Sequence, residues 1–117
     1  MIVIGDSLFS SEPSVSDSLL ASVNDYSPVG LDGARLLRVT PLALGVAITG
    51  LAGGVDGRLL LIDNMSTLFS LLLVNESLLS SARNRFSLPD LVNLSMSLNS
   101  SRWLRYDGPT SRWRVIA

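Results

Sequence analysis

The stretch SRWLRYDGPTSRWRVI, residues 101–116, holds two short segments rich in aromatic and β-favouring residues on either side of an Asp-Gly-Pro-Thr-Ser turn. An aspartate–glycine pair between two such segments is a strong local signal for a β-hairpin. The sequence therefore predicts a hairpin that closes the fold, with strands near residues 103–106 and 112–116.

Turn signals of the same kind divide the chain from Asn24 onward. They lie at Asp32-Gly33, Gly53-Gly54, Asp56-Gly57 and Asp107-Gly108. The apolar runs between them are about as long as strands, and they predict strands near residues 34–40, 42–49, 58–63, 67–74 and 91–98. Several short strands with glycine turns indicate an all-β fold, either a small antiparallel β-sandwich or a jelly-roll-like barrel.

Residues 1–23 differ from the rest of the chain, because they are rich in serine and acidic residues. We expect them to form an extended N-terminal arm outside the core, which leaves a β-sandwich domain over residues 24–117. Pro13 interrupts any long helix, but a short helix from about Ser16 to Ser22 remains an alternative, with Ser16 as its cap.

The composition predicts an assembly of several chains. Hydrophobic residues make up 47% of the sequence and the mean hydropathy is +0.41, while charged residues make up only 16%. The usual charged share is about 25%. Because so few charged groups cover the surface of a small domain poorly, we expect apolar surface to be hidden against partner chains, as in a homo-oligomer.

The absent residue types exclude several classes of function. The 117-residue chain contains no cysteine and no histidine, so it lacks thiolate sites, disulfides, the commonest general base and the commonest metal ligand. We therefore predict no cofactor and no metal site. The net charge of −1 argues against a nucleic-acid partner. No apolar run approaches the roughly 20 residues of a membrane span, so no membrane partner is expected.

Two segments are similar to catalytic motifs, and both lack an essential part. Residues 2–8 resemble the opening of a GDSL-type hydrolase with Ser7 as nucleophile, but that serine needs a base and the chain has no histidine. Residues 50–58 are rich in glycine but lack the Gly-Lys-Ser/Thr of a phosphate-binding loop. We expect a hairpin loop there, and we expect the protein not to be an enzyme.

The candidates for an interface come from the two ends of the chain. Residues 1–34 carry five acids and no base, whereas residues 83–117 carry six arginines against Asp90 and Asp107. The interface candidates are Ile2, Val3, Ile4, Leu8 and Phe9 in the arm and Arg102, Arg105, Arg112 and Arg114 near the C-terminus. We expect the arginines to pair with acids of the same or a neighbouring chain.

The three aromatic residues of the closing stretch have two interpretations. Trp103, Tyr106 and Trp113 either anchor the core or an interface, or they stack on a sugar or a base. The first interpretation is the commoner one for aromatic residues in a small β-domain.

Five segments share their order and spacing with a known module. They are Asn24-Asp25-Tyr26-Ser27-Pro28, Leu37-Arg38-Val39-Thr40, residues 48–58, residues 75–86, and Tyr106-Asp107-Gly108 with Ser111-Arg112-Trp113-Arg114-Val115. Together these segments resemble a β-module that recurs in virion proteins of tailed bacteriophages, among them tail fibres, spikes and head decoration or fibre proteins.

The resemblance implies a β-sandwich, commonly trimeric, with a structural role in the virion. The chain is one module plus an arm, without a shaft or a coiled coil, which favours a capsid decoration (cement) protein. Such a protein binds the major capsid protein, or another virion protein, at the capsid surface after assembly in the bacterial cytoplasm. The alternative is a tail fibre, a spike or a receptor-binding module.

Overall fold

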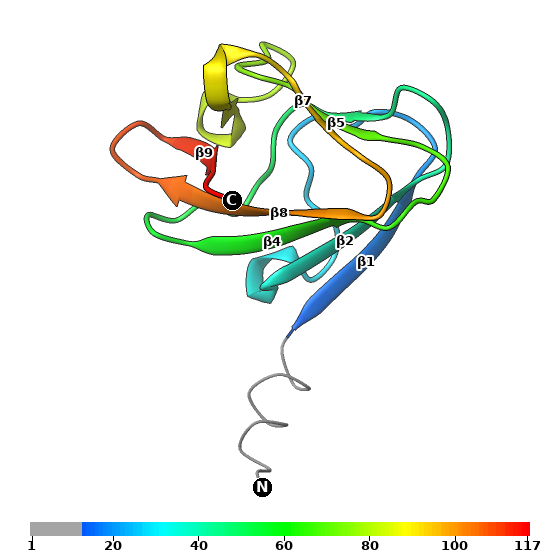
Figure 1. Ribbon diagram of the computed structural model, residues 1–117. Helices are drawn as coiled ribbons and strands as arrows, with labels where there is room; N and C mark the ends of the chain where they lie inside the picture. The colour runs from blue at the N-terminus through cyan, green and yellow to red at the C-terminus, as the bar shows by residue number, and fades with distance from the viewer. Residues whose placement is uncertain (1–12) are drawn as a thin grey trace, which may run out of the picture.

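The computed structural model describes residues 13–117, and it is an all-β structure of two sheets (Figure 1), as predicted. The larger sheet contains, in spatial order, β1 (Ser14–Leu19), β2 (Leu36–Pro41), β4 (Leu59–Asn64), β8 (Ser100–Asp107), β9 (Arg112–Val115) and β6 (Phe86–Ser87). The smaller sheet contains β3 (Ala47–Ile48), β5 (Leu71–Leu73) and β7 (Leu94–Met96). Three short 3-10 helices complete the described chain: η1 (Leu31–Gly33), η2 (Ala82–Asn84) and η3 (Pro89–Leu91).

The chain winds between the two sheets, and each turn lies on the one before. In the larger sheet Ser14 pairs with Leu36, and Leu36 pairs in turn with Leu61; both pairings are parallel. On the other side Val23 lies beside Ile48, which lies beside Leu73, again in parallel. This solenoid-like winding corrects the prediction of antiparallel pairing, because consecutive turns of a winding chain run in the same direction.

The predicted closing hairpin is confirmed. Strands β8 and β9 pair in antiparallel, with Tyr106 opposite Trp113. Strand β8 also pairs in antiparallel with β4, so the hairpin ends the parallel stack on that side. Residues 50–58, expected as a hairpin loop, lead instead from β3 in the smaller sheet to β4 in the larger one.

Three predicted strands are much shorter in the structure than in the sequence pattern, and of residues 67–74 only Leu71–Leu73 is a strand. Of residues 42–49 only Ala47–Ile48 is a strand, because the chain crosses between the sheets before it and turns at Gly45 with φ of 83°. Of residues 91–98 only Leu94–Met96 is a strand, since Asp90 and Leu91 have positive φ and break the extended backbone. In these last two cases a backbone turn overrides an apolar run.

One continuous core lies between the sheets. Residues of β2, β4, β8 and β9 alternate between buried and outward positions, as the period of a strand requires. The fully buried side chains from the larger sheet include Leu37, Val39, Leu60, Ile62, Leu104 and Trp113, and those from the smaller sheet include Ile48, Leu71, Leu73 and Met96. Each such side chain contributes about 1.5–3 kcal/mol by leaving water.

Part of the predicted arm belongs to this domain. Strand β1 pairs with β2 over its whole length, and Leu19 is buried. Its sequence alternates serines that point outward with Val15, Asp17 and Leu19, a period of two that suits a strand. The alternative of a helix over residues 16–22 is therefore wrong, and the arm boundary at residue 23 is corrected to the start of β1. The arm candidates Ile2, Val3, Ile4, Leu8 and Phe9 lie outside the described residues.

Strand β1 is also tied to the loop that follows it. The Tyr26 hydroxyl donates a hydrogen bond to the Asp17 carboxylate. Burial of the ring, together with this bond, raises the pKa of Tyr26 far above its ordinary value. The amide of Tyr26 donates to the Gly50 carbonyl of the next turn (2.8 Å). The first turn of the chain is thus held by side-chain and backbone bonds as well as by strand pairing.

Replacing Gly54 with alanine is expected to destabilise the fold. A Cβ at this position would overlap the ring of Tyr106. That ring cannot shift freely, because its hydroxyl bonds the Arg83 carbonyl and its side packs on Trp113. We expect Gly54→Ala to lower the free energy of unfolding by about 1–3 kcal/mol in urea denaturation. The control Gly33→Ala adds a Cβ that meets nothing within 4 Å, and it should change stability by less than about 0.5 kcal/mol. Equal stability of the two variants would contradict this packing.

Two truncations test the corrected arm boundary. Deleting residues 1–12 leaves β1 in place, so the free energy of unfolding should stay close to that of the full chain. Deleting residues 1–19 removes the strand and the buried Leu19 side chain, and it should cost at least about 2 kcal/mol. Denaturation followed by circular dichroism distinguishes the two. A fully stable chain without residues 1–19 would show that β1 is dispensable.

Candidate interaction sites

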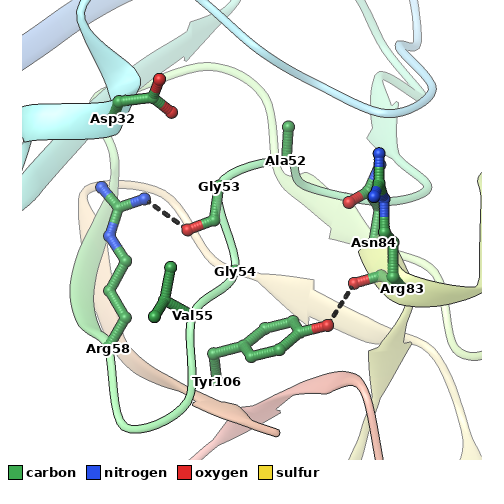
Figure 2. A pocket seen from close by; sticks show the side chains of 9 residues that line it. All are labelled: Asp32, Ala52, Gly53, Gly54, Val55, Arg58, Arg83, Asn84 and Tyr106. Atoms are coloured by element: carbon green, nitrogen blue, oxygen red, sulfur yellow. Dashed lines mark hydrogen bonds between the residues drawn. The ribbon is translucent and has the colours of Figure 1, made fainter.

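An open pocket of about 430 Å³ lies beside the loop between β3 and β4. Figure 2 shows Arg58 and Asp32 on one side of it, Arg83 and Asn84 on the other, and the Tyr106 ring between them. Gly53 and Gly54 supply the backbone of its wall. The pocket therefore brings together charged and amide groups from three separate loops and from β8.

The Arg58 guanidinium holds loops together. It donates to the carbonyl oxygens of Gly53 (2.8 Å), Ala34 (2.8 Å) and Leu31. Burial lowers the pKa of Arg58, and the nearby Asp32 carboxylate partly opposes that shift. Since these bonds join the η1 loop to the start of β4, the observed role of Arg58 is structural.

The pocket has the polar groups of a binding site but no pair of groups for nucleophilic catalysis. Its hydroxyl group, that of Tyr106, donates to the Arg83 carbonyl at 2.7 Å. A nucleophile needs a base within hydrogen-bond reach that is itself held in place by a third group. No such set lines this pocket.

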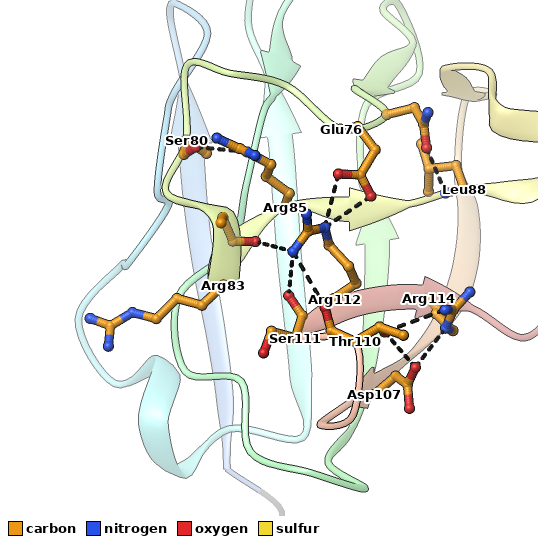
Figure 3. Close-up of polar contacts among 12 residues, drawn as sticks. Glu76, Ser80, Arg83, Arg85, Leu88, Asp107, Thr110, Ser111, Arg112 and Arg114 are labelled. Carbon is orange, nitrogen blue, oxygen red and sulfur yellow. Dashed lines mark hydrogen bonds and ion pairs between the residues drawn. The ribbon is translucent and has the colours of Figure 1, made fainter.

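Two of the four predicted interface arginines are engaged within the chain (Figure 3). Arg112 donates to both carboxylate oxygens of Glu76 at 2.9 Å and to the Ala82 carbonyl at 2.9 Å. Arg114 pairs with Asp107 at 3.1 Å. A bond from the Thr110 hydroxyl and this arginine lower the pKa of Asp107. These contacts fasten the hairpin and the residue 75–82 loop together.

The other two predicted arginines lie on β8 and form no ion pair with the described acids. Arg105 is exposed on the outward face of the strand. Arg102 is half-buried and lines a depression with Leu94, Val115 and Ile116. Within the described chain, Arg105 is the member of the predicted set best placed to contact another molecule.

The three aromatic residues of the closing stretch do not form one cleft. Trp113 is fully buried, and its indole N–H donates to the Leu51 carbonyl at 2.7 Å. Tyr106 is also buried and meets Trp113 edge to face, with ring centroids 5.2 Å apart. Trp103 is 41% exposed and points to the opposite face of the sheet. The core interpretation therefore holds for two of the three, and a shared stacking platform is absent.

A polar joint, which the sequence pattern did not indicate, connects three distant loops. The Asp25 carboxylate accepts bonds from the Ser81 amide and the Asn84 side chain, both at 2.8 Å. The Asp25 amide donates to the Ser80 hydroxyl (2.9 Å), and that hydroxyl lies 2.8 Å from the Thr49 hydroxyl. A Cβ at Gly50 would overlap Ser80. Three segments that are far apart in the sequence thus meet at this joint.

The buried Asn64 also has a structural role. Asn64, the first residue of an Asn-x-Ser sequon, is buried, and its amide donates to the carbonyl oxygens of Phe69, Met96 and Ser97. Across residues 13–117 no three acidic side chains gather in a group that could hold a metal ion. No helix in the same part of the chain is long and apolar enough to cross a membrane.

Comparison of the chain with protein-family models, with curated proteins and with solved structures gave no match. The functional argument therefore depends on the residues themselves and on the surfaces that they form.

The polar joint predicts a specific response to acid. Bonds from Asn84 and from the Ser81 amide lower the pKa of Asp25, so the folded chain keeps this carboxylate ionised at a lower pH than the unfolded chain does. The stabilisation is present above the unfolded-state pKa, about 3.9, and is lost as the pH falls through the folded-state value. We expect Asp25→Asn to lose less stability than the wild type between about pH 5 and pH 2, in urea denaturation at each pH.

The matched control for that experiment is Asp90→Asn. Asp90 has a similar positive φ, 59° against 45° for Asp25, but it is exposed and its carboxylate bonds no described group. Its variant should follow the wild-type pH profile. If Asp25→Asn follows that profile as well, the joint does not couple folding to protonation.

Proposed function

We propose that this protein is a structural component of a tailed-bacteriophage virion, most directly a capsid decoration protein that binds the head shell. The proposal starts from the resemblance of residues 24–117 to a module of such virions. The residues behind that resemblance form the polar joint and the glycine contacts of the core. These residues maintain the fold, so the function of a protein that contains the module depends on the surface that it presents.

The observation that carries the proposal is the apolar surface of the described chain. Large apolar side chains stand exposed on several loops, with exposed fractions of 97% for Val29, 88% for Leu44 and 85% for Leu78. Others lie on the outward face of the larger sheet. Apolar surface of this extent, in a chain with 16% charged residues, favours a protein whose working state is packed against other proteins.

The second candidate, a tail fibre, spike or receptor-binding module, is favoured by the polar pocket. Asp32, Arg83 and Asn84 line it and offer hydrogen-bonding groups of the kind that hold sugars. Sugar sites usually also present an exposed aromatic face, and Tyr106 is only 6% exposed. The decoration role is therefore preferred over a distal receptor-binding role.

Gold-labelled antibodies against the protein, applied to purified particles of the phage that encodes it, test the proposal by electron microscopy. Labels spread over the head shell support the decoration role. Labels confined to the tail or its fibres support the second candidate instead. Particles that carry no label, although the same antibody detects the purified protein, would contradict a virion role. Antibody absorbed beforehand with the purified protein is the control.

A further inference from the structure

The larger sheet has a second apolar surface on the face that points away from the core. Leu36 on β2, Leu61 on β4 and Trp103 on β8 are direct neighbours in the strand register. Ile116 is bonded to Trp103 through its amide (2.9 Å), and Leu59 lies two residues before Leu61. We call these five residues the outer patch. Leu36, Leu59, Leu61 and Trp103 alternate with buried residues of their strands, so they share one face. Ile116 follows the end of β9 and lies beside Trp103.

The outer patch is accessible in the single chain. The exposed fraction is 41% for Trp103, 50% for Leu59 and 52% for Ile116, while Leu60 and Ile62 between the β4 members are fully buried. Strand β4 therefore begins with an unbroken apolar run, Leu59-Leu60-Leu61-Ile62. Such runs are typical of strands that are covered on both faces, as in parallel sheets. Within the described chain the inner face of β4 is buried, whereas on its outer face Leu59 is exposed and Leu61 is half-buried.

The shape of the outer patch is compatible with contact between two copies of the same surface. A hollow of about 300 Å³ lies beside the indole of Trp103 and is lined by Arg35, Gly57 and Leu59. The indole therefore projects from the sheet at the edge of this hollow. Two such faces, turned against each other about the Leu36–Leu61–Trp103 row, bring the two indoles together at the centre of the contact. Aromatic anchors in pockets near the centre of an interface usually carry most of its binding energy.

The charges beside the patch point to a second copy of the chain. Arg105 pairs with Leu59 on one side of the Leu36–Leu61–Trp103 row, and Asp63 pairs with Ser101 on the other side. A two-fold axis along that row exchanges the two sides. It brings Arg105 of one copy toward Asp63 of the other, while the apolar row meets itself. Arg105 forms no ion pair with the described acids, although its charge helps to lower the pKa of Asp107. The Asp63 carboxylate accepts a hydrogen bond from the Ser101 hydroxyl (2.6 Å), and its contact with a cation, Arg38, is long at 3.9 Å.

We propose that the outer patch is the contact surface for a second copy of this chain, packed face to face with its strands antiparallel. The proposal deepens the proposed function, since it names the surface by which the protein forms a homo-oligomer. A contact of this kind is isologous and gives a dimer. It differs from the three-fold contact that the resemblance implies, and solution mass distinguishes the two.

The two tryptophans provide the test. Trp113 is fully buried within the chain and Trp103 is not, so quenching of fluorescence by acrylamide reports on Trp103. We expect quenching to fall as the protein concentration rises, in step with a mass of two chains by light scattering. In Trp103→Phe, where only Trp113 emits, quenching should be low at every concentration. Quenching that stays high while the protein remains a monomer would overturn the proposal, as would a mass of three chains.

Substitutions then locate the contact. Leu61→Ser should raise the dimer dissociation constant by roughly tenfold or more. The control Leu44→Ser removes a more exposed leucine that lies outside the patch, and it should leave the constant unchanged. Circular dichroism of both variants establishes that they fold. Equal dissociation constants for the two variants would place the interface elsewhere.

A charge exchange tests the orientation and the identity of the partner. Arg105→Asp and Asp63→Arg should each weaken the dimer, and the double variant should restore it, because both contacts of an isologous pair are then reversed together. No restoration would overturn the antiparallel packing. A third outcome would also overturn the proposal: acrylamide quenching of Trp103 that is low at every protein concentration and becomes high when residues 1–12 are deleted. That result would assign the outer patch to residues 1–12. Gold labelling of particles is independent of these results, so either proposal can fail alone.

Discussion

The structure depends on keeping the strands of successive turns of the chain in register with one another. Parallel strands from consecutive turns pair only if each loop between the sheets returns the backbone in register. Side chains bonded to backbone groups provide this constraint at the corners. Arg58 binds the carbonyls of Gly53, Leu31 and Ala34, and Asn64 binds those of Phe69, Met96 and Ser97. Each bridges segments that strand pairing does not join directly.

The same constraint explains why polar residues are found between the loops. Asp25, Thr49 and Ser80 form a connected set of hydrogen bonds between loops, and no buried side-chain nitrogen or oxygen in the described chain lacks a partner. Buried polar groups are costly unless they are satisfied, so the bonds of these residues help to hold the loops in place.

The closing hairpin has opposite consequences on its two faces. Inward, Trp113 and Tyr106 fill the core and the ring of Tyr106 receives the backbone of Gly54. Outward, the same strands carry Trp103 and Arg105, which the described chain does not cover. A strand alternates its side chains between two faces, so one short segment contributes both to the stability of the fold and to the surface that we propose as the contact between copies of the chain.

The sequence by itself determined the all-β class, the hairpin over residues 101–116 and the absence of the commonest catalytic residues, because these follow from local turn chemistry and composition. It did not reveal that β1, β2 and β4 are parallel neighbours, since turn signals specify where strands end and not which strands pair. The serine-rich composition of residues 14–19 also led to their prediction as part of an arm, although they form strand β1, whose inward residues are Val15, Asp17 and Leu19.

Only the tertiary structure decided the roles of the arginines and the aromatic residues. Arg112 and Arg105 look alike in the sequence, yet Arg112 binds both carboxylate oxygens of Glu76, which is far away in the chain. Arg105 instead stays exposed and acts only through its charge on the nearby Asp107. Trp103 and Trp113 both lie in the closing hairpin, but one is outside the sheet and the other inside. The physical reason is the same in each case: burial and pairing depend on which distant turn lies next to a residue, and local sequence carries no record of that neighbour.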